Sequence, residues 1–444
     1  MLITTYSGEK YCYSPRSNLI EKNSICDCCD DHRGFLRVDL PYDKDVLRDA
    51  CDNRVSYLIL GCTEHCNMRC KYCTYGSHFP NVRNHSNRKM LRETGDAAIR
   101  WLKEHSSRSE QIIIGFYGGE PMTEWENIKH WISFAKSIFS NKKISFNISS
   151  NGSVFPDDFL TWMKKDVNLH INITMNGIKE IHDRNRLFVS GKPTFDTVYD
   201  NVMRLRKCLQ NTFNEQVLLL VNYTDFSEKA RLQKWLNSDS VWEDVSRLLP
   251  IALPPNTEIA KTISRYSELD NQFLLWKARC NFVYNLDNTA ALPKMLENRI
   301  DMLKFIHNRY CKSLYKVIHP GICTPFASRV FVDVNGNIFQ CERTEDTISL
   351  GNVMGKVDYE LVNDIFISKM QKLIQHELKC HLCPFVRLCR ICFSVFLCNG
   401  GITQEQIIRR ECAKMRSDIK RDLEFYISVM EKKPNFWECL YGSK

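Results

Sequence analysis

The segment Cys66-Asn-Met-Arg-Cys70-Lys-Tyr-Cys73 follows the apolar run Ser56-Tyr-Leu-Ile-Leu-Gly61 and decides the fold. An apolar run that ends in glycine predicts a buried strand, so the three cysteines belong to the loop at its carboxyl end. Three thiolates on one short loop can hold three irons of a [4Fe–4S] cluster, because soft sulfur ligands suit such clusters. The fourth iron then lacks a protein ligand, and an open position of this kind is typical of catalytic metal sites.

The same spacing is compatible with a zinc knuckle. A structural zinc site is closed and needs a fourth ligand, which Cys62, His65 or His78 can provide. The spacing of the cysteines, taken alone, leaves an iron–sulfur cluster and a zinc site as alternatives.

Apolar runs alternate with amphipathic helical segments after the cysteine loop. The runs lie at residues 111–119, 144–152, 169–177 and 215–224. Continuous apolar strands separated by helices predict an α/β fold with a parallel sheet covered by helices. Functional residues of such sheets lie where the strands end. Glycine or asparagine follows four of the strands, at Gly61, Gly118 and Gly119, Asn151 and Gly152, and Asn176 and Gly177.

The pattern changes twice along the chain and predicts three regions. Residues 1–52 read as a small element with a hairpin and a helix, and residues 53–309 as the strand–helix region. In residues 310–444 the alternation stops and cysteines return. This last region contains a hairpin whose turn is Asn335-Gly336, the strongest short hairpin signal, and a dense cysteine segment at 380–412.

The cysteine loop and the strand ends behind it resemble the radical S-adenosylmethionine (SAM) superfamily. In that family a CX3CX2C loop follows the first strand of a partial (β/α)6 TIM-like barrel, and the likeness covers roughly residues 55–230. Three strand ends carry it: Phe116-Tyr-Gly-Gly-Glu-Pro121 resembles the glycine-rich GGEP segment, Ser149-Ser-Asn-Gly152 the segment near the cofactor ribose, and Thr174-Met-Asn-Gly177 the segment that usually reads Ser-x-Asp-Gly.

The resemblance implies a set of cofactor-binding residues. In the family the glycine-rich segment contacts the methionine amine, and Tyr72 matches an aromatic residue that packs near the adenine. Arg186, after His182-Asp183, corresponds to an arginine that pairs with the cofactor carboxylate, a use suited to a bidentate guanidinium. Asn176 stands where the family usually has aspartate. The implied cofactor-binding residues are Tyr72, Gly118, Gly119, Glu120, Pro121, Ser149, Asn151, Thr174 and Arg186; the sequence assigns no catalytic residue.

The resemblance also implies the chemistry. The open iron of the cluster chelates the amine and carboxylate of SAM, and an electron at a potential of roughly −400 mV or below cleaves the sulfonium. The resulting 5′-deoxyadenosyl radical abstracts a hydrogen from the substrate. The cofactor supplies the difficult chemistry, while the protein positions the atoms and excludes water. A flavodoxin- or ferredoxin-type electron donor is the expected partner.

A second group of cysteines lies near the C-terminus and resembles the SPASM extension of peptide-modifying radical SAM enzymes. That extension reads CX9–15GX4C, then CX2CX5CX3C, then a final cysteine. The first part matches at Cys323, Gly336 and Cys341, whereas CX2C at Cys389 and Cys392 stands where CX3C is usual. The remaining matches are Cys380, Cys383 and the final Cys412.

The SPASM resemblance implies two auxiliary [4Fe–4S] clusters besides the SAM-binding one. One takes four cysteines that close its coordination shell, which suits electron transfer or structure: Cys380, Cys383, Cys389 and Cys412. The other takes Cys323, Cys341 and Cys392, with Cys311 or Cys398 as the fourth candidate. With only three ligands, an open iron of this second cluster can bind a substrate thiolate.

The composition limits the compartment and the partners. The chain has 444 residues and 21 cysteines, yet the N-terminus lacks an apolar signal core. No run approaches the ~18 apolar residues of a membrane span. We therefore expect a reducing cytoplasm, where clustered thiols bind metals or do chemistry. The net charge of +9 comes from Lys and Arg spread along the chain, so neither a nucleic-acid nor a membrane partner is expected.

The sequence favours maturation of a ribosomally made peptide that carries a leader sequence. Thioether formation is the preferred chemistry, because two auxiliary clusters and an open iron suit a cysteine-rich substrate. Formylglycine formation on a sulfatase, peptide epimerisation and carbon–carbon crosslinking are alternatives within the same class. A non-catalytic zinc or iron–sulfur binding protein is the alternative from a different class, and it leaves the glycine-rich strand ends without a purpose.

Four N-terminal cysteines have no role in this hypothesis: Cys12, Cys26, Cys28 and Cys29. They form either a site for metal or substrate sulfur, or an exposed and non-essential patch. About 50 residues precede the barrel, so we expect at most a truncated form of the leader-binding module that many peptide maturases carry.

Overall fold

Six apolar runs form parallel strands in the computed structural model of the chain. They are β5 (Tyr57–Thr63), β7 (Gln111–Gly118), β8 (Lys143–Ser150), β9 (Leu169–Thr174), β11 (Val217–Tyr223) and β12 (Leu248–Ala252). They lie in the order β12-β11-β9-β8-β7-β5, so strands adjacent in sequence are adjacent in the sheet. Sequential parallel strands joined by helices are the arrangement of a partial barrel of this kind. The predicted α/β fold with a parallel sheet is confirmed.

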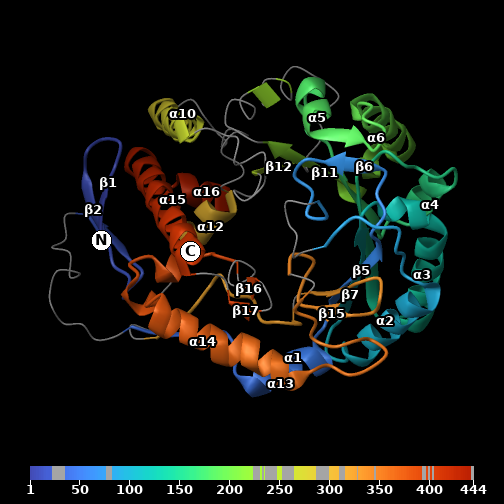
Figure 1. Cartoon of the computed structure of the whole chain (residues 1–444). Helices are drawn as coiled ribbons and strands as arrows, with labels where there is room; N and C mark the ends of the chain where they lie inside the picture. Colours follow the sequence, from blue (N-terminus) through green and yellow to red (C-terminus); the bar gives the residue numbers. More distant parts are fainter. Residues whose placement is uncertain are drawn as a thin grey trace. The chain divides into compact units, whose positions relative to one another are not determined.

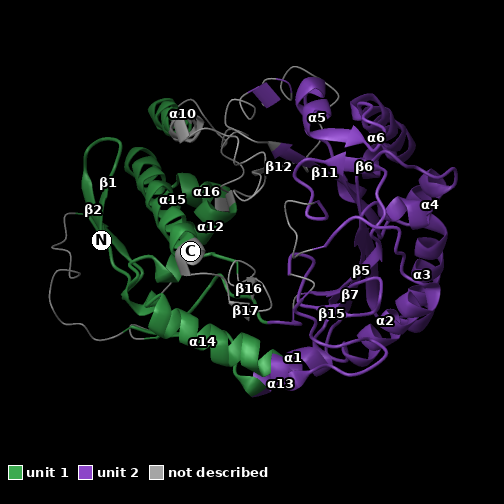
Figure 2. Ribbon diagram, viewed as in Figure 1, with its two compact units in different colours: residues 1–44, 272–324, 362–444 green, residues 45–271, 325–361 purple. Residues whose placement is uncertain are grey.

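The structure describes residues 1–22, 36–76, 83–223, 231–232, 235, 248–252, 265–286, 300–309, 316–327, 329–344, 347–392, 397–398, 401–402 and 405–441. These residues fall into two compact units, coloured separately in Figure 2. Unit 1 comprises residues 1–44, 272–324 and 362–444, and unit 2 comprises residues 45–271 and 325–361. This interleaved grouping differs from the consecutive regions that the sequence predicts, and the division at residues 52 and 309 stays a prediction.

Helices cover the outer side of the strands in unit 2 (Figure 1). They are α2 (Arg92–Glu104), α3 (Trp125–Ile138), α4 (Phe159–Lys165) and α6 (Phe195–Leu209). Alternate residues of β7 such as Ile112 and Ile114 are fully buried, as the two-residue period of a strand requires. Helices α2 and α3 pack closely because residue 95 is glycine: a Cβ there would lie 2.2 Å from the ring of Trp131.

Shorter elements complete unit 2 around the ends of the strands. They are α1 (Lys44–Asn53), β6 (Met68–Cys70), a 3₁₀ turn (Pro121–Glu124), α5 (Lys179–Asn185), β10 (Arg186–Phe188), a 3₁₀ turn (Gln210–Thr212) and α7 (Phe213–Gln216). The helix expected near residue 45 is thus present as α1, and it belongs to the same unit as the sheet.

A hairpin from late in the sequence extends the sheet beyond β5. Strand β14 (Val330–Val332) pairs in parallel with β5, and β15 (Ile338–Phe339) pairs antiparallel with β14. Gly336 has a φ of +84°, the left-handed conformation that favours glycine in such a turn. The hairpin at Asn335-Gly336 is confirmed, whereas its place beside the first barrel strand was not expected from the sequence.

Unit 1 combines the N-terminal hairpin with helices from the C-terminal part of the chain. Its helices are α10 (Arg265–Tyr284, of which residues 272–284 belong to this unit), α12 (Ile300–His307), α15 (Glu405–Lys432) and α16 (Phe436–Tyr441). Its strands are β1 (Leu2–Thr4), β2 (Lys10–Tyr13), β3 (Ile20–Lys22), β4 (Arg37–Asp39), β13 (Lys316–Ile318), β16 (Leu397–Cys398) and β17 (Gly401–Ile402). The core of this unit includes Tyr13, Phe282, Leu388, Tyr426 and Trp437.

A helical run precedes the C-terminal cysteines. It consists of α13 (Tyr359–Asn363), a π-helical stretch (Asp364–Lys369), α14 (Met370–Lys372) and a second π-helical stretch (Leu373–Glu377). Two 3₁₀ turns then follow, at Cys380–Leu382 and Val386–Leu388.

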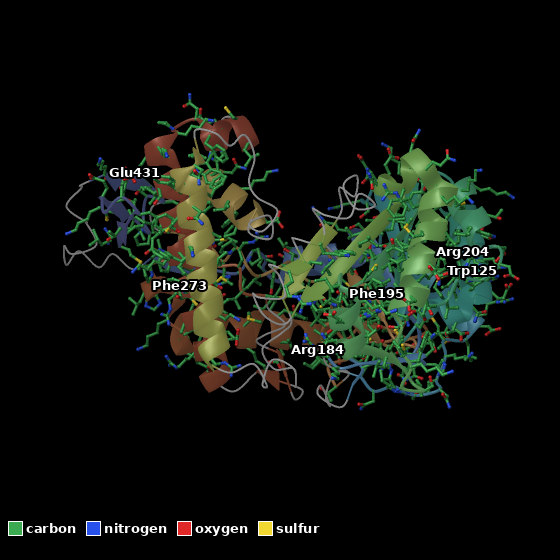
Figure 3. The ribbon with its side chains drawn as sticks, turned by 90° about the horizontal axis from the view of Figure 1, so that it is seen from above. Trp125, Arg184, Phe195, Arg204, Phe273 and Glu431 are labelled. Atoms are coloured by element: carbon green, nitrogen blue, oxygen red, sulfur yellow. The ribbon has the colours of Figure 1, made fainter. Side chains whose placement is uncertain are left out.

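The first residues of the chain are integrated into unit 1. The predicted hairpin is present as β1 and β2, and the hydroxyl of Thr5 donates a hydrogen bond of 3.2 Å to Glu431 of α15, which is labelled in Figure 3. A buried ion pair of 2.6 Å between Arg279 and Asp422 fastens α10 to α15. None of the helices in the described part of the chain is both long and apolar enough to cross a lipid bilayer.

Candidate active site

The cysteine loop leaves the carboxyl end of β5, where the sequence predicts it. After Cys66 the chain forms β6, which ends at Cys70 and pairs antiparallel with β10. Cys73 follows in a tight turn, in which its amide donates to the carbonyl of Cys70 at 3.1 Å. All three thiols are free, and Cys66 is buried. The fold therefore gathers the three predicted ligands on one short, ordered loop.

N–H groups point at two of these sulfurs. The amide of Met68 lies 3.4 Å from Sγ of Cys66, and the amide of Tyr75 lies 3.4 Å from Sγ of Cys73. The side-chain amide of Asn151 is 3.7 Å from Sγ of Cys66. Hydrogen bonds of this kind favour the charged form of the sulfur. Burial outweighs them in the metal-free loop, because it raises the pKa of Cys66 to about 11 and that of Cys73 to about 12. Metal binding must therefore displace protons from the thiols.

The glycine pair at the end of β7 holds the cysteine loop in place. A Cβ at Gly118, whose φ is +139°, would lie 2.2 Å from the carbonyl oxygen of Thr63. A Cβ at Gly119 would lie 2.1 Å from the carbonyl oxygen of His65. The amide of Gly119 donates to Thr63 at 2.7 Å, and the amide of Glu120 donates to His65 at 2.8 Å. In the structure, then, the backbone that approaches the glycines is that of the cysteine loop itself.

Glu120 ties the end of β7 to the end of β8. Its fully buried carboxylate accepts hydrogen bonds from the amide of Met122 at 3.0 Å, the hydroxyl of Ser150 at 2.8 Å and the amide of Asn151 at 2.7 Å. Burial raises the pKa of Glu120 to about 7. Pro121 begins the 3₁₀ turn that follows. Burial thus disfavours the charged form of this carboxyl, and the three hydrogen bonds favour it.

Arg186 lies beside the loop as the first residue of β10, opposite Cys70. Its guanidinium is buried and donates from Nη1 to the hydroxyl of Tyr72 at 3.0 Å and from Nη2 to the carbonyl of Asn151 at 3.1 Å. Desolvation opposes the charge, yet Cys70 and Tyr72 outweigh it and raise the pKa of Arg186. Arg184 differs in position, because it is exposed and belongs to α5 (Figure 3).

Tyr72 and Asn176 join the loop to the ends of β9 and β11. The hydroxyl of Tyr72 donates to Oδ1 of Asn176 at 3.2 Å, and the same oxygen accepts from the amide of Asn222 at 3.3 Å. Asn176 is buried, and its Nδ2 has no hydrogen-bond partner among the residues that the structure describes. The asparagine that replaces the usual aspartate acts here as an acceptor between two strand ends. Asn222 follows the apolar run of β11, a signal that the sequence analysis did not use.

A buried histidine supports Arg186 from behind. His182 is fully buried, and its Nε2 lies 3.0 Å from Oγ1 of Thr194, which in turn donates to the carbonyl of Arg186 at 2.9 Å. Burial, with a smaller contribution from Arg186, lowers the pKa of His182 to about 2, so the imidazole is neutral. Asp183 accepts from the amides of Thr194 and Phe195 at the start of α6. His182 and Asp183 thus fix the segment that carries Arg186.

Ser149 and Thr174 lie at the ends of β8 and β9. Both are partly exposed, and they alternate with the buried residues Ile148 and Ile173. They therefore lie on the strand face opposite the helices, where a bound cofactor would be reached. Their cofactor contacts stay a prediction.

The zinc alternative at this loop gains no support from Cys62. That residue lies within β5, is fully buried, and its thiol is 3.5 Å from the carbonyl of Leu60. Burial raises the pKa of Cys62 far above its ordinary value. His65 contributes its main-chain groups to the contact with the glycine pair. His78 lies outside the described residues.

Four C-terminal cysteines line one cavity of about 70 Å³ in unit 1: Cys380, Cys383, Cys389 and Cys412. Burial raises the pKa of Cys380 and Cys389 to about 12, and neighbouring thiols add to both shifts. His319 and Arg416 also line the cavity, and the sequence analysis identified neither. The donor set of four thiols fits a metal centre with a closed shell.

The remaining predicted ligands of the auxiliary clusters are distributed over both units. Cys323 is exposed and Cys392 half-buried in unit 1, and Cys341 is buried in unit 2 directly after β15. Cys311 lies outside the described residues, as do the side chain of Cys398 and the N-terminal residues Cys26, Cys28 and Cys29. Cys12 is buried in β2 and disulfide-bonded, so it is not part of an exposed patch.

The residues at the end of the barrel sheet fit the predicted cofactors. Three free thiols, two of them with N–H donors, suit a [4Fe–4S] cluster with one open iron. A buried guanidinium and a buried carboxyl beside them, Arg186 and Glu120, suit the charged ends of an amino acid. Fold and site together define an α/β enzyme that depends on an iron–sulfur cluster.

Comparisons with known proteins identify the family. Residues 60–232 match the model of the radical SAM superfamily. A cysteine-type anaerobic sulfatase-maturating enzyme of Clostridium novyi (strain NT) is 24% identical over 350 residues, 76% of this chain and 87% of that protein. The chain contains a radical SAM domain, is homologous to anaerobic sulfatase-maturating enzymes, and is a radical SAM enzyme.

Two solved structures have the same fold. A histidine-tagged form of anSMEcpe with bound AdoMet has a TM-score of 0.59 and 20% sequence identity, over 87% of this chain and 98% of that chain. Native anSMEcpe with bound AdoMet and the Cp18Cys peptide has a TM-score of 0.58 and 21% identity, over 85% of this chain and 99% of that chain. The likeness thus spans most of this chain, well beyond the matched domain.

Proposed function

We propose that this radical SAM enzyme matures a polypeptide by removing hydrogen from the side chain of a cysteine and converting that cysteine to formylglycine. The observation that carries the proposal is the three-thiol loop, which is held against Gly118 and Gly119, in a chain that aligns with 87% of a cysteine-type maturating enzyme. The 5′-deoxyadenosyl radical would take one hydrogen atom, and the second hydrogen would leave as a proton and an electron that an iron–sulfur cluster accepts. Water would then replace the sulfur, so hydrogen sulfide is the second product. This was an alternative in the sequence analysis, and the relatives now favour it.

The loop would bind the iron–sulfur cluster, and residues at the strand ends would bind SAM. Cys66, Cys70 and Cys73 would ligate three irons, and a bound cluster with SAM supplies a 5′-deoxyadenosyl radical that abstracts hydrogen. Arg186 would pair with the SAM carboxylate and Glu120 would accept from its amine, with both charges desolvated. The remaining proposed cofactor contacts are Tyr72, Gly118, Gly119, Pro121, Ser149, Asn151 and Thr174.

The C-terminal cysteines would hold two auxiliary clusters. The four cysteines of the unit 1 cavity leave no open coordination position, which suits electron transfer or structure. The second cluster would take Cys323, Cys341 and Cys392, with Cys311 or Cys398 as the fourth ligand. In this division residues 310–444 act as a SPASM-like domain, residues 53–309 as the radical domain and residues 1–52 as an N-terminal element.

Thioether formation is the second candidate. The observation that favours it is the presence of cysteines beyond the seven that form the loop and the unit 1 cavity, because an auxiliary iron with an open position can hold a substrate thiolate. Both reactions begin with a cysteine-containing polypeptide and both need a low-potential electron donor, for which a cytoplasmic flavodoxin or ferredoxin is suited. A peptide with a leader sequence is the expected substrate of this second reaction.

Mass spectrometry of a cysteine-containing peptide after anaerobic reaction tests the proposal. The reconstituted full chain, SAM and a chemical reductant are incubated with a synthetic sulfatase-type cysteine peptide. Formylglycine lacks the sulfur of the cysteine and reacts with a hydrazide, whereas a thioether loses only hydrogen and keeps its sulfur. Recovery of the peptide unchanged, while SAM is still cleaved, would contradict maturation of this substrate. A product that retains sulfur would favour the thioether.

A further inference from the structure

The guanidinium of Arg83 packs against β14 and β15, the hairpin strands of unit 2. It is only 4% exposed. Its guanidinium carbon is 4.3 Å from the ring centroid of Phe331 and 5.1 Å from that of Phe339, on β14 and β15. Its Nη1 donates to the main-chain oxygen of Glu342 at 2.9 Å. Two aromatic rings and one hydrogen bond therefore fix both the plane and the orientation of this group.

The other edge of the guanidinium has no partner in the described structure. Nε and Nη2 of Arg83 are buried, and neither atom makes a hydrogen bond. Their N–H bonds run parallel, and this edge of arginine is one that grips the two oxygens of a carboxylate. A buried donor without an acceptor costs free energy, so a carboxylate that reached this edge would gain two hydrogen bonds that the fold leaves unmade.

A second arginine of the same segment shows what such an edge does when a carboxylate is present. Arg88 donates from Nε to Oε2 of Glu64 at 2.8 Å and from Nη2 to Oε1 at 2.7 Å. Arg83 has no such partner in Glu342, because the carboxylate of Glu342 accepts from Nη1 of Arg329 at 3.0 Å and 3.3 Å. Five residues apart, one arginine fork is thus filled by a carboxylate of the chain, and the other has no acceptor among the described residues.

Contacting aromatic rings connect Arg83 with the cysteine loop. The ring of Phe331 lies 6.4 Å from that of Tyr117, and Tyr117 lies 6.3 Å from Tyr75. The amide of Tyr75 contacts Sγ of Cys73 at 3.4 Å. The rings of Phe331, Tyr117 and Tyr75 therefore link the guanidinium of Arg83 to the turn that carries the third cysteine.

We propose that Arg83 binds a carboxylate of the polypeptide substrate, either an acidic side chain or the C-terminus, beside the radical SAM site. The inference rests on the proposed function and names the substrate class more closely. The carboxylate of SAM has the same chemistry. In the proposed function Arg186, and not Arg83, binds the carboxylate of SAM. Arg186 contacts Asn151 at the end of β8, and β8 and β14, which carries the ring beside Arg83, lie on opposite sides of β5 in the sheet.

Calorimetric titration with paired peptides tests this assignment. The reconstituted full chain, loaded with SAM, is titrated with cysteine peptides that carry Asp or Glu in one member of a pair and Asn or Gln in the other. A further pair has a free or an amidated C-terminus. We expect at least one acidic member to bind about tenfold more tightly than its amide, and Arg83→Lys to abolish that preference because lysine keeps the charge and loses the fork.

Two further variants complete the comparison. Arg83→Gln should lose the same preference, and iron content confirms that both Arg83 variants fold and carry clusters. Arg88→Lys is the matched control, because its fork is already occupied by Glu64, and it should keep the wild-type preference. Equal binding of acid and amide by the wild type, or an unchanged preference in Arg83→Lys, would overturn the proposal.

Two further outcomes show whether the unpaired edge binds SAM instead of the peptide, and whether the proposed function fails while the carboxylate site stands. A loss of SAM affinity in Arg83→Lys, with the peptide preference unchanged, would assign the edge to the cofactor and overturn the substrate assignment. Product formation is read separately by mass. A peptide that binds with an acid preference that depends on Arg83, but is not modified, would support the carboxylate site and contradict the proposed function.

Discussion

The cysteine loop of unit 2 and the cysteine cavity of unit 1 use the same ligand in different surroundings. The loop offers three thiols and sets a buried guanidinium and a buried carboxyl beside them, from Arg186 and Glu120. The cavity offers four thiols, and most of its other lining residues are apolar, among them Leu378, Phe385, Ile391 and Ile419. The polar residues described in the lining of the cavity are His319, Arg409 and Arg416, so the loop has a buried carboxyl for which the described cavity lining has no counterpart.

In the proposed assignment, this difference separates a catalytic cluster at the loop from a cluster in the cavity that serves electron transfer or structure. An iron with an open position needs groups that orient a second ligand, and buried charges provide that orientation at a cost in desolvation. An iron with a complete shell needs only thiolates and an environment that sets its potential. The number of cysteines and the polarity around them therefore both favour a catalytic cluster at the loop and a non-catalytic cluster in the cavity.

The largest effect is expected from removing the loop thiols. Replacement of Cys66, Cys70 and Cys73 by Ala should remove about four of about twelve irons, because each [4Fe–4S] cluster depends on its thiolates. Cleavage of SAM should cease entirely. Iron and sulfide analysis of anaerobically purified protein, with an assay for 5′-deoxyadenosine, measures both results. Zinc in place of iron in the wild-type protein would contradict the cluster assignment.

Removing two thiols of the cavity should separate the two sites. Cys380→Ala with Cys383→Ala should also remove about four irons, yet SAM binding should persist because its ligands lie in the other unit. Peptide modification should fail. Parallel measurements of SAM affinity and peptide product check this pair of outcomes. Normal modification by the variant would show that the C-terminal cluster is dispensable.

A smaller effect is expected at the cofactor carboxylate. Arg186→Ala should weaken SAM binding by at least about tenfold, or ~1.4 kcal/mol, because a buried charge would lose its partner. Arg184→Ala is the control, since this neighbour is exposed on α5, and it should change the affinity little. Calorimetric titration of both reconstituted variants decides the matter. A larger loss at Arg184 would mean that the family's arginine has been placed on the wrong residue.

An effect on stability alone is expected from His182, which supports Arg186. His182 has a pKa of about 2 in the folded protein against 6.5 ordinarily, so only the unfolded chain takes up this proton between those values. Its contribution to stability therefore decreases as the pH falls below 6.5, by about 1.4 kcal/mol per pH unit. Denaturant titrations between pH 7.5 and 5 should show a shallower loss for His182→Gln. His170→Gln, at a partly exposed site, should keep the wild-type slope; a slope unchanged in His182→Gln would refute the prediction.

The sequence predicted those parts of the fold that depend on neighbouring residues. The strands, the amphipathic helices and both hairpins have local periodicity and turn residues, and the cysteine spacing is itself a local signal. The pairing of β14 with β5 has no such signal, because it joins segments far apart in the chain. The packing of the first residues with α15 cannot be predicted from local sequence for the same reason.

The candidate site shows the same limit at the level of single residues. Gly118 and Gly119 stood out as a glycine pair at a strand end, but only the structure shows that the cysteine loop packs against them. Arg83 gave no signal at all, since one arginine among many is distinguished only by its burial and its unpaired edge. His319 precedes Cys323 by four residues in the sequence and was overlooked, although it lines the cavity of the other four cysteines.

The pairing of β14 with β5 also has a consequence for synthesis of the chain. Leu58 pairs with Val330, so 272 residues (330 − 58) must be made after the first barrel strand before its partner exists. At roughly 5–20 residues per second, that interval lasts on the order of 14–54 s. Throughout it, β5 presents an unpaired edge, and such edges invite pairing with other chains. Ribosome-bound chains that end before residue 325 should therefore aggregate or recruit chaperones more than chains that end after residue 361.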